Sequence, residues 1–257
     1  MTRILAGNWK MNLGIAEARS LLESIRAQRS VAPNLRIVLF PPYTALAPLA
    51  AERRPGDPEL GAQNCHAEPK GAFTGEIAAE QVRDAGAAFV LVGHSERRRL
   101  FGENDALLGA KLRAAWRAGL TPFLCVGETL AERERHHTRD VLARQLGRSL
   151  EGAPPHAPLV VAYEPVWAIG TGVVATPSEV AEAHAWTREE LERAGRDDTT
   201  PVPVLYGGSV DPKAAGTLSA LPEVDGFLVG GASLSGASFL SIARSLEEAR
   251  TESRGAR

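Results

Sequence analysis

Cysteine is scarce in this chain, which contains only Cys65 and Cys125 among its 257 residues. A disulfide framework requires more cysteines, so we expect both thiols to be reduced and buried in a cytoplasmic protein. No apolar run approaches the roughly 18 residues of a membrane span. The first apolar segment, 4–9, is interrupted by polar residues too early for a signal peptide. These absences argue against secretion and against a membrane partner.

An excess of positive charge is also missing. Lys and Arg total 29 against 31 Asp and Glu, which gives a net charge of −2 at pH 7. Proteins that bind nucleic acid usually show a basic excess, so nucleic acid is not expected as a partner, although a local anion site remains possible. Lysine itself is rare, with only Lys10, Lys70, Lys111 and Lys213.

What the chain does contain is a regular alternation of two kinds of segment. Short apolar runs that end in glycine or a polar residue are typical of buried strands, and longer stretches rich in Ala, Leu, Arg and Glu show helical spacing. The predicted strands are 4–8, 36–40, 59–64, 89–93, 121–126, 159–164, 202–206 and 226–230. The clearest predicted helices are 15–29, 77–85, 106–118, 130–150, 177–194 and 237–249.

Strict alternation of strand and helix predicts a parallel sheet. About eight such units in a chain of this length fit a closed (β/α)8 barrel of eight parallel strands, as a single domain over residues 1–257. The alternative is an open, doubly wound sheet, which normally carries a glycine-rich nucleotide loop after its first strand. That loop pattern is absent here, where the first strand ends Gly7-Asn8-Trp9-Lys10. The polar tail, 251–257, is expected to be frayed.

Ionisable side chains stand at the end of three predicted strands or just after it, as expected for a site where strands end and helices begin. These residues are Lys10, His94 and Glu164. His94 precedes a predicted helix start, which disfavours a proton on the imidazole, so a neutral His94 would donate a hydrogen bond to a carbonyl. Glu164 precedes the apolar stretch 165–172. We interpret this stretch as a lid that excludes water and makes the carboxylate a stronger base.

Two glycine pairs, Gly207-Gly208 and Gly230-Gly231, end the last two predicted strands. Glycine lets backbone N–H groups approach an anion closely, and the N-terminus of a following helix adds positive potential. The phosphate site of such barrels usually lies after strands seven and eight. The pairs therefore predict a phosphorylated substrate.

Three other arrangements of residues are weaker evidence for a functional site. The stretch 133–137 includes two adjacent histidines, but it lacks histidines at i and i+4, so we interpret it as a solvated helix face and expect no metal. Cys125 has no neighbouring base that would favour a nucleophile over a buried thiol. Lys10, at a strand end, would suit a Schiff-base aldolase.

The motifs at the strand ends resemble those of the triosephosphate isomerase family along essentially the whole chain. The matching stretches are Gly7-Asn8-Trp9-Lys10-Met11-Asn12, Gly61-Ala62-Gln63-Asn64, Gly71-Ala72-Phe73-Thr74-Gly75-Glu76, Gly93-His94-Ser95-Glu96-Arg97-Arg98, Cys125-Val126-Gly127-Glu128, the stretch 163–172, Tyr206-Gly207-Gly208-Ser209-Val210 and the stretch 226–233. The resemblance implies reversible interconversion of dihydroxyacetone phosphate and D-glyceraldehyde 3-phosphate through an enediolate, in glycolysis and gluconeogenesis. It implies no metal and no cofactor.

The resemblance also implies a role for each catalytic residue. Glu164 would be the base that moves the proton between adjacent carbons, and His94 would be the neutral electrophile. Lys10 and Asn8 would bind substrate and stabilise the enediolate oxygen. Glu96 would help to set the electrostatics around Lys10.

For the phosphate, the resemblance implies backbone contacts from the residues Gly170, Ser209, Gly230 and Gly231. Tyr206 and Ser209 would latch the closed lid. The loop from Lys70 to Glu76 would dock into a second subunit of a homodimer, with Thr74 reaching the partner's site. At the rear of the lid Val173 and Val174 replace the expected lysine-led hinge, which concerns lid kinetics and leaves the chemistry intact.

Two further functions fit the same residues. A related ketose phosphate, such as a four-carbon one, would need only a change in pocket volume. A barrel without activity, retained as a binding protein, is the alternative from a different class, and the presence of every acid–base residue argues against it.

Overall fold

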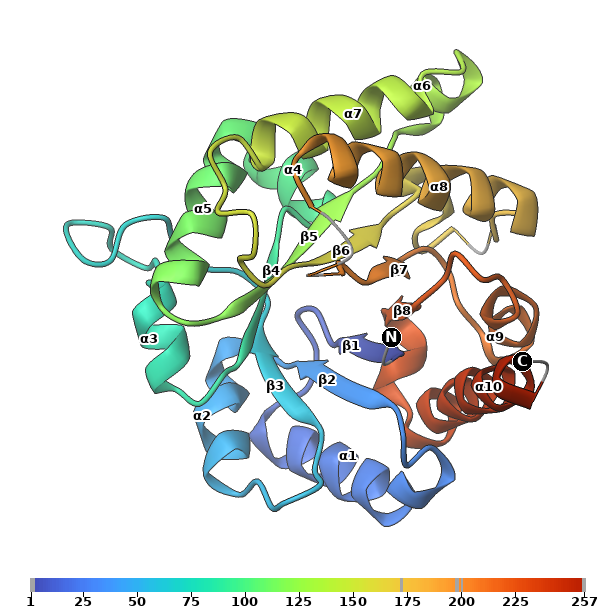
Figure 1. Cartoon of the computed structure of the whole chain (residues 1–257). Helices are drawn as coiled ribbons and strands as arrows, with labels where there is room; N and C mark the ends of the chain where they lie inside the picture. Colours follow the sequence, from blue (N-terminus) through green and yellow to red (C-terminus); the bar gives the residue numbers. More distant parts are fainter. Residues whose placement is uncertain (1–2, 172, 197–198, 200, 256–257) are drawn as a thin grey trace.

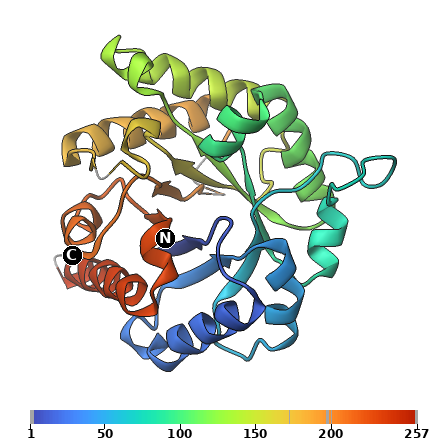
Figure 2. The same ribbon diagram turned by 180° about the vertical axis from the view of Figure 1, so that it is seen from behind.

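The structure is a computed structural model that describes residues 3–171, 173–196, 199 and 201–255. Eight parallel strands pair in chain order, and β1 also pairs with β8, so the sheet closes into a barrel (Figure 1, and Figure 2 from behind). The strands are β1 Ile4–Asn8, β2 Arg36–Phe40, β3 Glu59–Ala62, β4 Phe89–Val92, β5 Thr121–Val126, β6 Val160–Tyr163, β7 Val204–Tyr206 and β8 Gly226–Val229. This topology confirms the predicted (β/α)8 barrel and excludes the open sheet.

Helices surround the barrel on all sides (Figure 1). They are α1 Ile15–Ala27, α2 Tyr43–Ala51, α3 Ala79–Asp84, α4 Ser95–Phe101, α5 Asp105–Arg117, α6 Leu130–Glu134, α7 Thr138–Ser149, α8 Pro177–Arg193, α9 Pro212–Ser219 and α10 Gly236–Gly255. Within the described residues three short 3-10 helices accompany them, η1 Arg29–Val31, η2 Val166–Ala168 and η3 Gly231–Leu234.

Alternate strand residues point to opposite faces of the sheet and therefore supply two separate apolar cores. Phe40, Phe89 and Phe123 belong to the core inside the barrel, where the ring of Phe123 lies 5.2 Å from that of Phe40 and 5.6 Å from that of Phe89. The larger core fills the space between the strands and the helices. A filled interior leaves the ends of the barrel as the places where a ligand site fits.

Two predicted helical segments differ from the structure. The segment 130–150 is two helices, because His136 adopts a left-handed φ of +60° between α6 and α7. At the C-terminus α10 continues to Gly255, so most of the tail that was expected to be frayed is helical, and residues 256–257 lie outside the described residues.

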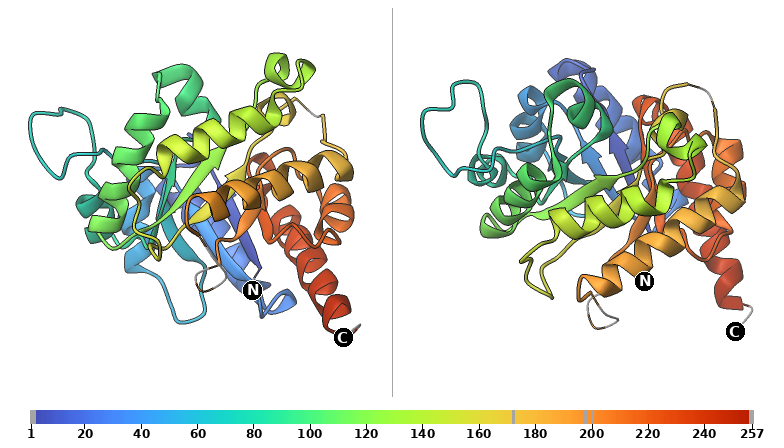
Figure 3. Two further views of the ribbon diagram at one scale, coloured as in Figure 1. Left: turned by 45° about the horizontal axis from the view of Figure 1, so that its top comes forward. Right: turned by 90° about the horizontal axis from the view of Figure 1, so that it is seen from above.

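The connection between β3 and α3 extends away from the body of the molecule in both views of Figure 3. Its base is closed by a hydrogen bond from the backbone N–H of His66 to the carbonyl of Ile77, at 2.8 Å. Near its tip the ring of Phe73 lies 4.2 Å from that of His66, and Phe73 remains 43% exposed. This is the loop from Lys70 to Glu76 that was predicted to dock into a second subunit.

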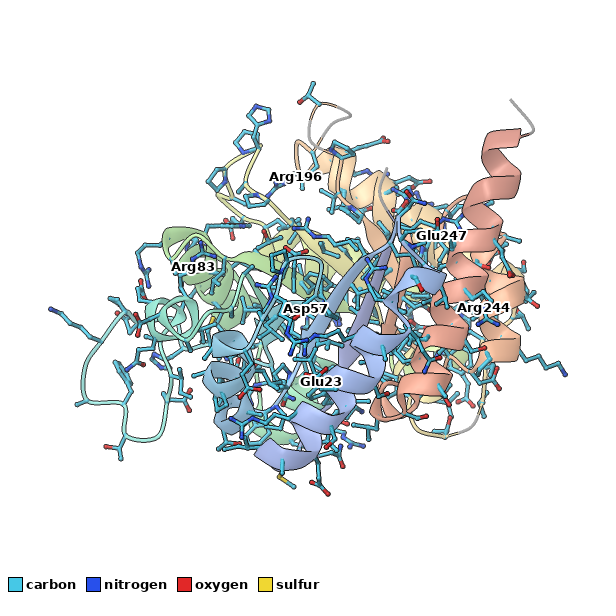
Figure 4. All side chains as sticks on the ribbon, turned by 90° about the horizontal axis from the view of Figure 1, so that it is seen from below. Glu23, Asp57, Arg83, Arg196, Arg244 and Glu247 are labelled. Atoms are coloured by element: carbon cyan, nitrogen blue, oxygen red, sulfur yellow. The ribbon has the colours of Figure 1, made fainter. Side chains whose placement is uncertain are left out.

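The end of the barrel where the strands begin is occupied by ion pairs. Arg26 of α1 binds Asp57, at 2.5 Å, and also Glu23, and both carboxylates are labelled in Figure 4. Arg36 and Glu59, at the first residues of β2 and β3, form a second pair at 2.5 Å. The predicted functional residues lie at the other end.

Candidate active site

A cavity of about 340 Å³ opens where the strands end, a volume suited to a small ligand. Its lining includes eight of the nine predicted site residues, namely Asn8, Lys10, His94, Glu164, Gly170, Ser209, Gly230 and Gly231. The ninth, Glu96, lies beside the cavity as the ion-pair partner of Lys10. The barrel therefore gathers residues from the ends of β1, β4, β6, β7 and β8 at one place.

Glu164 follows β6 and is 2% exposed, so its carboxylate has little contact with water. The backbone N–H of Ser95 donates to Oε2 of Glu164 at 2.9 Å. The other oxygen, Oε1, lies 3.3 Å from Nε2 of His94 and has no hydrogen-bond partner in the part of the chain that is described. One oxygen thus orients the carboxylate, and the other is available to a reacting group.

His94 immediately precedes α4, and its ring is oriented by that helix. The backbone N–H of Glu96 donates to Nδ1 of His94 at 3.2 Å. A ring nitrogen that accepts a hydrogen bond carries no proton, so the neutral imidazole has its proton on Nε2. That proton is on the side of Glu164, and the role of His94 as a neutral hydrogen-bond donor to a carbonyl stays a prediction.

Lys10 is held in an uncommon conformation with φ +51°. Its backbone N–H donates to Oδ1 of Asn8 at 3.0 Å, and its carbonyl accepts from Nε2 of Gln63 at 2.7 Å. Its ammonium lies 2.6 Å from Oε1 of Glu96. Partial burial acts against the charged form of Glu96, but the hydrogen bond from Lys10 and the positive charge of its ammonium outweigh it and lower the pKa of Glu96.

The glycine pair Gly207-Gly208 is required by close packing. A Cβ on Gly208 would lie 2.2 Å from the hydroxyl oxygen of Tyr206, and one on Gly207 would lie 2.9 Å from Cγ of Glu164. Larger residues here would displace the base. The pair therefore allows close packing around Glu164, and its contact with an anion stays a prediction.

The predicted lid, 165–172, lies between β6 and α8, and its rear hinge begins at Val173. Residue 172 lies outside the described residues. Ser209 contacts it twice, because its backbone N–H and its hydroxyl donate to the carbonyl of Ala168 at 3.0 and 2.6 Å. Burial raises the pKa of Tyr206 to about 12, against an opposing contribution from the backbone of Ala175 at the rear of the lid. Both residues predicted as latches thus lie beside the lid.

Two nearby groups were not predicted as parts of the site. The amide of Ser95 contacts Glu164, which the predicted helix start after His94 hinted at. Cys125 is fully buried, as predicted for a structural thiol. Burial and then the charge of Glu164 hold the pKa of Cys125 well above its usual range, so the thiol stays neutral.

The interpretation of 133–137 as a solvated helix face is wrong for Arg133. Its side chain is only 22% exposed, and its guanidinium carbon lies 5.1 Å from the ring centroid of Trp167 in the lid. Glu128, which follows β5, is fully buried and accepts from Tyr163 and Trp167 at 3.1 and 2.9 Å. Sequence spacing held no signal for these contacts, because the partners are distant in the chain.

Neither a metal centre nor a membrane-spanning helix is found in the part of the chain that the structure describes. Within residues 3–171, 173–196, 199 and 201–255, no group of three or more His, Cys, Asp or Glu side chains is arranged to hold a metal ion. No helix in the same ranges has both the length and the apolar character needed to cross a lipid bilayer.

Comparison with known proteins agrees with this geometry. The family model described as triosephosphate isomerase matches residues 3–246. Triosephosphate isomerase of Bradyrhizobium diazoefficiens is 46% identical over 241 residues, which cover 94% of this chain and 96% of that protein. Triosephosphate isomerase of Dinoroseobacter shibae is 47% identical over 245 residues, covering 95% and 98%.

A solved structure shows the same fold. The crystal structure of triosephosphate isomerase from Bartonella henselae superposes with a TM-score of 0.87 at 40% identity, and covers 95% of this chain and 99% of that chain. The family model, the sequence relatives and the solved structure each match nearly the whole length of this chain. The chain therefore belongs to the triosephosphate isomerase family.

Proposed function

We propose that this chain catalyses the reversible isomerisation of dihydroxyacetone phosphate and D-glyceraldehyde 3-phosphate, at the cavity where its strands end. Family membership supports the reaction. The single observation that carries the residue assignment is the 3.3 Å approach of Nε2 of His94 to Oε1 of Glu164. It places a hydrogen-bond donor and a carboxylate on one small-molecule cavity, as a proton transfer beside a carbonyl requires.

The reaction follows from these two groups. Glu164 takes a proton from the carbon next to the carbonyl, and Nε2–H of His94 donates to the carbonyl oxygen as negative charge develops there. The proton of the neighbouring hydroxyl moves by way of His94 to the former carbonyl oxygen. Glu164 then returns its proton to the former carbonyl carbon, which leaves the new carbonyl on the neighbouring carbon. Electrons move only within the substrate, so no external oxidant or reductant is needed.

Lys10 and Asn8 supply the remaining electrostatic stabilisation. Both line the cavity, and the hydrogen bond from the N–H of Lys10 to Oδ1 of Asn8 fixes the turn that carries the ammonium. Glu96 anchors that ammonium at 2.6 Å. A cation fixed before the reaction stabilises the developing oxyanion without reorganising during it.

The phosphate is proposed to bind at the opposite side of the cavity, against backbone atoms. Ser209, Gly230 and Gly231 follow the adjacent strands β7 and β8, and Gly170 belongs to the lid. Backbone N–H groups of glycine-rich segments suit a dianion because no side chain blocks its approach. A lid residue among the phosphate ligands would link binding to exclusion of water.

We also propose that the chain works as a cytoplasmic homodimer through the loop from Lys70 to Glu76. Segments after β1, β3 and β4 expose large apolar side chains, with Met11 97%, Phe73 43%, Leu100 64% and Phe101 66% exposed. Large apolar side chains exposed on segments that follow neighbouring strands are typical of an interface. Two free, buried cysteines fit a reducing compartment.

The Schiff-base alternative finds less support in the same site. Lys10 is ion-paired with Glu96, whereas a lysine that forms a Schiff base must reach its neutral form. Borohydride reduction with substrate would trap an adduct on Lys10 if this alternative were correct.

The proposed function is tested by a coupled assay in both directions, with a four-carbon ketose phosphate assayed beside the two triose phosphates. We expect turnover of the triose phosphates and its near-complete loss in Glu164→Gln, which preserves shape and removes the base. Faster turnover of the four-carbon sugar would overturn the substrate assignment. Full activity of Glu164→Gln would overturn the base assignment.

A further inference from the structure

Arg133 of α6 contacts both ends of the lid region from a single position, with Trp167 at its front and Glu179 of α8 just beyond its rear hinge. Neither end is near it in sequence, since Trp167 and Glu179 are 34 and 46 residues away. The α6–α7 segment and α8 lie on the same side of the barrel in Figures 1 and 3. The catalytic scheme above assigns no role to this arginine.

At the front of the lid, Arg133 helps to hold Trp167. The indole N–H donates to Oε1 of Glu128 at 2.9 Å, and Nη1 of Arg133 lies 3.4 Å from the same oxygen. The guanidinium also covers the indole ring at 5.1 Å. Because Glu128 is fully buried, its carboxylate depends on these donors for charge compensation.

At the rear of the lid, the same guanidinium reaches the start of α8. Nη2 of Arg133 donates to Oε1 of Glu179 at 2.7 Å. The other oxygen of Glu179 accepts the backbone N–H of Thr176 at 2.7 Å, and the hydroxyl of Thr176 accepts the N–H of Glu179 at 3.3 Å. This capping box fixes the residue at which the lid ends.

The geometry requires an arginine. A planar guanidinium presents separate N–H groups to two carboxylates while its face covers an aromatic ring, which a lysine ammonium does not do. The side chains of Arg133 and Glu179 are 22% and 30% exposed, so solvent screens their interaction only in part. The contacts therefore form one connected unit that spans both hinges.

We propose that Arg133 is a positioning residue that ties the two hinges of the lid together, and so sets how readily the lid orders over the substrate phosphate. The proposal rests on the proposed function, in which Gly170 of the lid binds the phosphate. Loosening the hinges would increase the entropy lost when the lid orders, whereas Glu164 and His94 are held by the barrel. The kinetic effect of loosening the hinges would therefore be mainly an increase in KM.

The kinetic test uses Arg133→Met, Glu179→Gln and the double variant. Gln at 179 still accepts the Thr176 N–H, so it removes the ion pair and keeps the capping box. For D-glyceraldehyde 3-phosphate we expect KM to rise about three- to tenfold in Arg133→Met, with kcat within about twofold of wild type. The double variant should be no worse than Arg133→Met alone. For glyceraldehyde, which lacks the phosphate, kcat/KM should not change.

The matched control is Arg139→Met. Arg139 binds Glu189 of α8 at 2.6 Å, so it also joins this helical layer to α8, but it contacts no lid residue among the described contacts. We expect wild-type kinetics from it. Equal effects of the two arginine variants, or an equal loss of kcat/KM with glyceraldehyde, would overturn the proposal.

A spectroscopic test separates this proposal from the proposed function. With 5-fluorotryptophan the four tryptophans give four 19F resonances, and Trp167→Phe identifies that of Trp167. We expect the Trp167 line to change in width in Arg133→Met and Glu179→Gln, and to be unchanged in Arg139→Met. An unchanged line in both lid variants would overturn the role of Arg133 even in an active enzyme. An inactive wild type would overturn only the proposed function.

Discussion

Nε2 of His94 and Oε1 of Glu164 lie 3.3 Å apart, with the carboxylate oriented from its other oxygen by the Ser95 amide. Glu164 does not hold this position through its sequence neighbours, because Ser95 is 69 residues away in the chain. His94 is oriented by the first turn of α4, and Glu164 by an amide of that same turn. A small displacement of either group is therefore expected to affect the chemistry more than the fold.

Glu164→Asp tests the position of the carboxylate. Removing one CH₂ draws it back by roughly 1 Å, which lowers kcat by on the order of 10²-fold. The free energy of unfolding should fall by no more than about 1 kcal/mol, the value of one hydrogen bond. Steady-state kinetics and urea unfolding measure the two effects. A variant within a few-fold of wild-type kcat would contradict the assignment of the base.

Lys10→Ala removes the ammonium from the cavity. We expect KM to rise and kcat to fall together, because the charge acts on the bound substrate and on the enediolate. The pKa of Glu96 should also rise, since its main hydrogen-bond donor is lost. Lys213→Ala, at an exposed position of α9, is the control for loss of one positive charge. Wild-type kcat/KM in Lys10→Ala would exclude the electrostatic role.

Gly127→Ala tests the packing behind the base. A Cβ at this position would lie 1.8 Å from the carbonyl oxygen of Glu164, so the end of β6 must move. We expect kcat/KM to fall at least about tenfold and stability to fall by about 1–3 kcal/mol. Gly147→Ala in α7 is the control, because its Cβ meets open space and should stabilise the helix by about 0.5–1 kcal/mol. Equal activities of the two variants would contradict this account.

Phe73→Asp tests the proposed dimer. An unpaired carboxylate in an interface is costly, and the stacking on His66 at 4.2 Å is lost as well. We expect dissociation and loss of activity to occur together over a dilution series followed by sedimentation velocity and kinetics. Phe73→Tyr keeps the ring and should behave as wild type. Fully active monomers would refute the coupling, and an unchanged dimer would refute the placement of Phe73.

The buried His184 predicts how stability depends on pH. Burial lowers its pKa from 6.5 to about 4, opposed by the hydrogen bond to the carbonyl of Glu223. Between these values the unfolded chain binds the proton more strongly, so stability present above pH 6.5 is lost as the pH falls toward 4. Over the whole titration of His184 the free energy of unfolding changes by about 3 kcal/mol.

The measurement is urea unfolding between pH 4.5 and 6.5 for wild type and His184→Gln. The ion-paired carboxylates with lowered pKa values, such as those of Glu96 and Glu179, titrate below their usual 4.5 and so contribute little in this window. Gln retains a donor for the Glu223 carbonyl and does not titrate. The slope of stability with pH should therefore decrease in the variant, and an equal slope would show that other groups cause it.

The barrel itself was predictable from the sequence, because alternation of strand and helix repeats along the whole chain and is a local property. Three of the predicted strands match the structure at both ends, β1, β2 and β5. Glycine pairs and polar residues at strand ends were also sufficient to predict where the cavity lies, and phosphate binding there stays a prediction. Parallel strands in a closed barrel place all their carboxyl ends at one face, so position along a strand determines position in the site.

Contacts between residues distant in the chain were not predictable in this way. The break at His136 separates α6 from α7, and no proline or glycine stands there to predict it. Arg133 looked like part of a solvated face, since its partners Trp167 and Glu179 reach it only after β5, β6 and α8 have packed together. The sequence by itself determined which residues stand at the strand ends. Only the tertiary structure decided which of them touch, because burial and charge compensation depend on neighbours that packing supplies.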